Sequence, residues 1–84
     1  MGYKVFMNVS DELLIDRCAK SLANYYLGRT KGTYVALMKE EMYTRPSLVS
    51  FDTYGNKYIS SLVWEIVKER AKVIQEDIEK QERG

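Results

Sequence analysis

The sequence contains no histidine and only one cysteine, Cys18. A single cysteine cannot form a disulfide within its own chain, and it is typical of proteins from a reducing compartment. Without histidine or a second thiolate, we expect no structural metal site. Histidine is also the most common general acid or base near neutral pH, so its absence weakens the case for an enzyme.

The short motifs of familiar catalytic sites are missing as well. There is no glycine-rich phosphate loop, no Gly-x-Ser-x-Gly sequence and no aspartate-rich metal cluster. Asp11, Glu12 and Asp16 are acids of the kind that usually mark the start of a helix. We therefore expect a binding protein, not an enzyme, with no catalytic residue, no metal and no cofactor.

Length and charge limit the organisation of the chain. Its 84 residues suit a single domain, residues 1–84, and so short a chain is only marginally stable alone. With disulfides and metals excluded, we expect a homo-oligomer, first of all a dimer. The net charge is only +1, and there is neither a signal pattern nor an apolar run of about 18 residues. These features predict a cytoplasmic protein without a membrane span.

Residues Tyr3–Val9 alternate between two kinds of side chain, which predicts a strand with one buried side and one exposed side. Ser10 then offers a helix N-cap. The two sides of the strand are Val5, Met7 and Val9 on the apolar side and Lys4, Phe6 and Asn8 on the other.

A first helix is predicted from Asp11 to about Leu27, and Gly28 is its natural stop. Cys18 lies on the apolar stripe of this helix, where we interpret it as a small core residue. The stripe comprises Leu14, Cys18, Leu22 and Tyr25 or Tyr26, widened by Ile15 and Ala19.

A second helix is predicted from Thr30 or Thr33 to about Tyr43, and Pro46 ends it. Its apolar face is expected to hold Tyr34, Leu37, Met38 and Met42. The following residues, 47–58, suit either a loop or a small hairpin with arms at Leu48–Asp52 and Lys57–Ser61.

The last segment has the clearest helical spacing of apolar residues, interrupted by Arg70. Trp64 lies off the densest part of this stripe, so it suits either an interface anchor or a cover for the edge of the core. The fold class is therefore α+β and mostly helical. The expected order is a strand-helix-helix unit over residues 3–44, a loop or short hairpin over 45–57 and a long helix over 58–82.

The run Lys4-Val5-Phe6-Met7-Asn8-Val9-Ser10-Asp11-Glu12-Leu13-Leu14 and the turn Leu27-Gly28-Arg29-Thr30-Lys31-Gly32-Thr33 resemble the ribbon-helix-helix family of DNA-binding proteins. The resemblance covers residues 3–42. It implies a dimer whose two N-terminal strands pair and enter the major groove, as in a transcriptional regulator. By position, it implies that Lys4, Phe6 and Asn8 face the bases.

The same resemblance implies a phosphate contact at the start of the second helix. Backbone amides of Lys31, Gly32 and Thr33 would point outward, with help from the Thr30 and Thr33 hydroxyls. Arg29 and Lys31 would add positive charge. The partner implied is duplex DNA.

Other interpretations of the same residues stay open. Phe6 suits packing under the C-terminal helix as well as a base contact. The small size, the many aromatics and the absence of catalytic groups also suit a viral or mobile-element accessory protein that inhibits a host protein. A variant is a homo-oligomer that sequesters a nucleotide-like ligand, with tyrosines for stacking and Arg29, Lys31 and Arg45 for charge.

Overall fold

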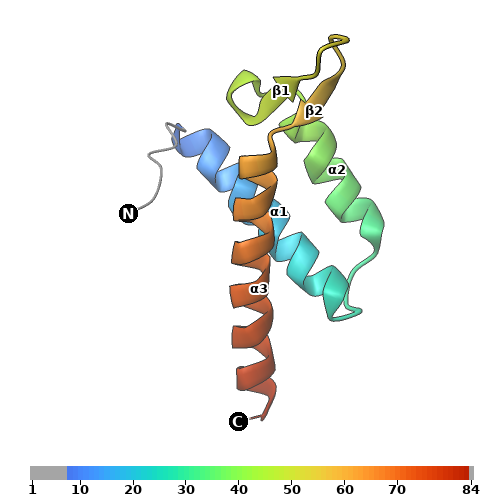
Figure 1. Cartoon of the computed structure of the whole chain (residues 1–84). Coiled ribbons are helices and arrows are strands. Elements are labelled where there is room, and N and C mark those ends of the chain that lie inside the picture. The colour runs from blue at the N-terminus through green and yellow to red at the C-terminus, as the bar shows by residue number, and fades with distance from the viewer. Residues whose placement is uncertain (1–7, 84) are drawn as a thin grey trace.

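The computed structural model describes residues 8–83, and Figure 1 shows how their helices and strands are arranged. Three helices and one small hairpin make up this part of the chain. None of the described helices is long and apolar enough to cross a membrane. In chain order the elements are α1 (Val9–Tyr26), α2 (Gly32–Met42), a 3-10 turn (Pro46–Leu48), β1 (Val49–Phe51), β2 (Lys57–Ile59) and α3 (Ser61–Arg83).

The first helix begins earlier than the sequence predicts. Its N-cap is Asn8, whose Oδ1 accepts a hydrogen bond from the amide of Asp11 at 2.8 Å, so Ser10 is not the cap. Val9, expected on the strand, is therefore helical, while residues 3–7 of that strand lie outside the described residues. Within residues 8–83 both strands follow two helices, so the expected order of strand, helix and helix is wrong for this part.

The other helix and strand boundaries lie within three residues of the predicted ones. Arg45 has an extended backbone, with φ −107° and ψ 108°, because a proline follows it. The segment after it forms the small hairpin, in which β1 and β2 pair antiparallel with Val49 opposite Ile59. The long last helix begins at Ser61, three residues later than expected.

The hairpin turn is organised by Asp52. Its Oδ1 accepts the amides of Tyr54 at 2.9 Å and Asn56 at 2.8 Å, and Gly55 takes a φ of 83°. The hydrogen bond from the Asn56 amide, joined by those from Tyr54 and Gly55, holds the pKa of the Asp52 carboxyl below its ordinary value.

The core lies where α1 packs against α2 and α3. Figure 1 shows α1 crossing behind α3, with α2 to the right of α3 in this view. Tyr25 and Tyr26, one of which was expected in the stripe, are both about half exposed. The buried apolar side chains are Leu14, Ile15, Cys18, Ala19, Leu22, Ala23, Val35, Met42, Leu48, Val63, Val67 and Ala71.

The inward face of α2 differs from the predicted one. Val35 and Met42 are buried and Met38 packs against the core, whereas Tyr34 and Leu37 are about half exposed. The first seven residues of α2, Gly32–Met38, carry no charge, so the spacing of apolar residues alone did not select the inward face. That face is the one in contact with α1.

The structure explains two residues whose roles the sequence did not decide, Trp64 and Arg70. Trp64 packs half-buried against the core, so it covers the core edge. Arg70, which interrupts the apolar stripe of α3, pairs through Nη1 with Glu12 at 3.0 Å and with Asp16 at 2.8 Å. Two acidic residues in the first half of α1 therefore anchor α3 to α1 through ion pairs with Arg70.

Candidate nucleic-acid interface

The turn between α1 and α2 is closed by hydrogen bonds that follow from a single glycine. Gly28 has a φ of 73°, a backbone conformation that other residues avoid. The amide of Gly28 donates to the Tyr25 carbonyl at 3.0 Å, and that of Arg29 donates to the Asn24 carbonyl at 2.8 Å. This pair of bonds is the Schellman pattern, which ends α1 and turns the chain toward α2.

The start of α2 is open to an anion. Its N-cap residue is Lys31, and no side chain among the described residues caps the helix. The first amides of a helix have no acceptor within it, and they carry the positive end of its dipole. Gly32 lies under the Tyr25 ring, since a Cβ at that position would stand 3.3 Å from Cε1 of Tyr25.

Three basic residues meet at this turn. Lys20, Arg29 and Lys31 line an open groove of about 660 Å³, together with Asn24 and other polar groups. Lys20 and Lys31 are exposed, and no ion pair within residues 8–83 involves either of them. Arg29 pairs with Glu82 from the last turn of α3.

The structure brings together only part of the predicted DNA-binding set. Arg29, Thr30 and Lys31 line the groove, and Gly32 and Thr33 form the first turn of α2 beside it. The Thr30 hydroxyl donates to the Ser21 carbonyl at 3.5 Å, so it serves the turn itself.

The residues predicted to face the bases are not part of this cluster. Asn8 lies at the far end of α1, about 27 Å from the turn by helix length. Its side-chain oxygen is engaged as the N-cap. Lys4 and Phe6 lie outside the described residues.

Lys20 was missed by the sequence-based prediction, although a signal was present. It lies four residues before Asn24 on α1, so both side chains share the helix face that ends at Gly28. A search for cations one or two turns before the helix stop would have found it.

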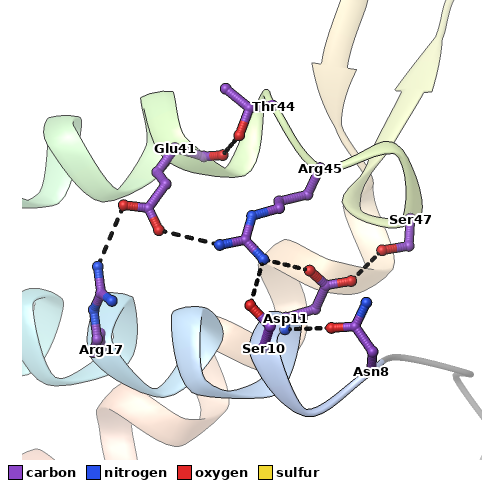
Figure 2. Close-up of polar contacts among 8 residues, drawn as sticks. All are labelled: Asn8, Ser10, Asp11, Arg17, Glu41, Thr44, Arg45 and Ser47. Carbon is purple, nitrogen blue, oxygen red and sulfur yellow. Dashed lines mark hydrogen bonds and ion pairs between the residues drawn. The ribbon is translucent and has the colours of Figure 1, made fainter.

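Within one chain, the three basic residues of the predicted nucleotide pocket, Arg29, Lys31 and Arg45, do not lie together. Arg29 and Lys31 precede α2, whereas Arg45 follows it, and an 11-residue helix is about 16 Å long. Arg45 instead joins the start of α1 to the end of α2, as Figure 2 shows. Its Nη1 donates to Ser10 Oγ at 2.8 Å and to Asp11 Oδ1 at 3.0 Å.

The single thiol is not part of any such site. Cys18 is fully buried in the core, which confirms its interpretation as a core residue. Burial raises the pKa of the Cys18 thiol from 9.0 to about 11, and the charge of Lys39 opposes this only in part. A thiol that keeps its proton at neutral pH is a poor nucleophile.

Comparison with known proteins identified no relative of this chain. No protein family, no curated protein and no solved structure matches this chain.

Proposed function

We propose that this chain is a non-enzymatic DNA-binding protein that holds duplex DNA by its phosphates at the turn between α1 and α2. The observation that carries the proposal is the uncapped start of α2 beside Lys20, Arg29 and Lys31 in one groove. Backbone amides at a helix start donate hydrogen bonds to a phosphate oxygen, and lysine and arginine supply most of the affinity for a DNA backbone.

Shape supports the same partner. The groove is open and three basic residues line it, which suits the edge of a large polyanion better than an enclosed small molecule. Phosphate contacts of this kind position a protein on DNA without reading its sequence. In the proposal, two chains form a dimer, and Lys4 and Phe6 face the bases. That part rests on the resemblance of residues 3–42 to ribbon-helix-helix proteins, and it leaves out Asn8, whose side chain caps α1.

The test compares two double variants that remove equal charge. Lys20→Gln with Lys31→Gln removes the two lysines of the groove, and Lys68→Gln with Lys72→Gln removes two exposed lysines of α3. Binding to a labelled duplex is measured by fluorescence anisotropy over a range of salt concentrations. We expect the groove variant to bind at least about tenfold more weakly. The slope of the logarithm of its binding constant against the logarithm of the salt concentration, here called the salt slope, should be smaller in magnitude by about 2.

The control variant should bind nearly as the wild type does. Equal weakening of both variants would mean that overall charge, not this groove, attracts the DNA. Absence of binding by the wild type at low salt to both random and selected duplexes would overturn the proposal.

A further inference from the structure

A second groove lies at the other end of α2, where α2, β2 and the start of α3 meet. It measures about 320 Å³, and its walls include Tyr43, Tyr58 and Trp64. Figure 1 shows this region beside the hairpin, away from the turn that joins α1 to α2. The volume lies at the lower end of the range for small-molecule sites, which is about 300–1,000 Å³.

The cation of this groove is Lys39, and its ammonium rests on an aromatic ring. The Lys39 ammonium lies 4.6 Å from the centroid of the Trp64 ring, and no ion pair within the described residues involves it. Glu65, the acid in the wall, is instead 2.8 Å from the ammonium of Lys68. Lys39 is half-buried as a residue, and an ammonium that lies over an aromatic face without a carboxylate partner among residues 8–83 favours an anion beside it.

The rest of the wall suits a flat ring with a polar edge. The rings of Tyr43 and Tyr58 offer stacking surfaces, while Lys39 takes the face of Trp64. The Ser61 hydroxyl and the Glu65 carboxylate lie in the same wall and provide hydrogen-bonding partners for ring substituents. Ser61 is also the first residue of α3, so the positive end of that helix dipole adds to the charge of Lys39.

We infer that this groove binds a nucleoside phosphate, with its base on a tyrosine ring and its phosphate beside Lys39. A free nucleotide and a nucleotide within a single strand share this chemistry. The site is separate from the proposed duplex-binding groove, because the two lie at opposite ends of α2.

Trp64 makes the inference directly testable. It is the only tryptophan of the chain, so its fluorescence reports on this groove without a label. The probes are AMP, a short single-stranded oligo(dA) and inorganic phosphate, each titrated to about 1 mM, above the dissociation constants of about 10⁻⁴ M or lower for unspecific nucleic-acid binding. We expect saturable quenching and protection of Trp64 from acrylamide.

The two sources of the nucleotide give different results. Saturation by AMP and oligo(dA) alike assigns a free-nucleotide site, whereas saturation by oligo(dA) alone assigns a site for single strands, and either outcome supports the inference. The inference is overturned if neither AMP nor oligo(dA) gives a saturable change in Trp64 fluorescence. It is also overturned if inorganic phosphate gives a change as large as that of the nucleotides.

Two variants locate the contact. Tyr58→Leu should weaken binding at least about fivefold through the lost stacking, and Lys39→Gln should lower the salt slope for oligo(dA) by about 0.7. The matched controls are Tyr54→Leu at the exposed hairpin tip and Lys72→Gln on α3, which should change neither value. Acrylamide protection of the wild type needs no variant, so it remains decisive if a substitution disturbs folding.

The double variant that removes Lys20 and Lys31 should keep this binding unchanged. Loss of oligo(dA) binding in that variant, with Tyr58→Leu unaffected, would place the strand at the first groove and overturn the inference.

Discussion

Arg45 and Asp11 are 34 residues apart in the sequence, and Nη1 of Arg45 lies 3.0 Å from Oδ1 of Asp11. The Asp11 side chain is only 3% exposed, and its second oxygen accepts the hydroxyl of Ser47. Arg45 also reaches Glu41 at 3.4 Å (Figure 2). This ion pair ties the first turn of α1 to the chain that leaves α2.

The first prediction concerns the loss of this pair. Arg45→Met leaves the Asp11 carboxylate buried without its cation, and removal of one partner of a buried pair costs about 3–5 kcal/mol. Because Arg45 is itself partly exposed, we expect a loss of about 3 kcal/mol in the free energy of unfolding. Urea denaturation followed by circular dichroism measures it.

A matched control is available at Glu41, which both Arg45 and Arg17 contact. Arg17 pairs with Glu41 at 3.3 Å, and their side chains are 56% and 38% exposed, far more than the Asp11 side chain. Arg17→Met should therefore cost less than about 1 kcal/mol. Equal losses in Arg17→Met and Arg45→Met would show that the burial of Asp11 adds nothing.

The second prediction distinguishes Asn8 from Ser10 as the cap of α1. Asn8→Ala removes the acceptor of the Asp11 amide and should cost about 1 kcal/mol. Asn8→Asp keeps an acceptor and places a negative charge at the helix start, so it should restore that stability. The free energy of unfolding of the three proteins gives the answer. A full loss in Asn8→Asp would exclude capping as the reason.

The sequence predicted the helices well because their ends carry local signals. Gly28 and Pro46 act on the backbone within one or two residues, and the apolar spacing of α3 is visible without any partner. The cap of α1 was misplaced because Asn8 and Ser10 are both good caps two residues apart. Only the folded backbone shows which one reaches Asp11.

The candidate site was predictable only where it is contiguous in the sequence. Arg29, Thr30 and Lys31 are neighbours in one turn, so their shared position follows from that turn. Lys20 comes from a different part of α1, and Glu82 approaches Arg29 from the other end of the chain. The second groove joins α2, β2 and α3, and no local pattern relates Tyr43 to Trp64.

The third prediction tests the turn that shapes the first groove. Gly28 has a φ of 73°, and a Cβ added there would meet nothing within 4 Å. Gly28→Ala therefore adds backbone strain without a clash, and we expect a loss of about 1–2 kcal/mol. Gly28→Asn should cost less, because asparagine tolerates this conformation. Thermal unfolding ranks the three proteins, and a ranking with alanine above asparagine would contradict the assigned backbone.

The last prediction follows from the buried thiol. Burial raises the pKa of Cys18 from 9.0 to about 11, so between these values the unfolded chain releases a proton that the folded chain keeps. The stabilising contribution is fully present below pH 9 and is lost as the pH rises through 11. A separation of two pKa values by about 2 corresponds to about 2–3 kcal/mol.

The comparison with Cys18→Ala isolates this effect from the titration of tyrosines and lysines, which both proteins share. The variant begins less stable because it lacks the buried sulfur, but its free energy of unfolding should fall less between pH 8.5 and 10.5 than that of the wild type. We expect a difference of about 2 kcal/mol between the two decreases. Parallel curves would mean that the thiol ionises in the folded protein as readily as in the unfolded chain, which its complete burial opposes.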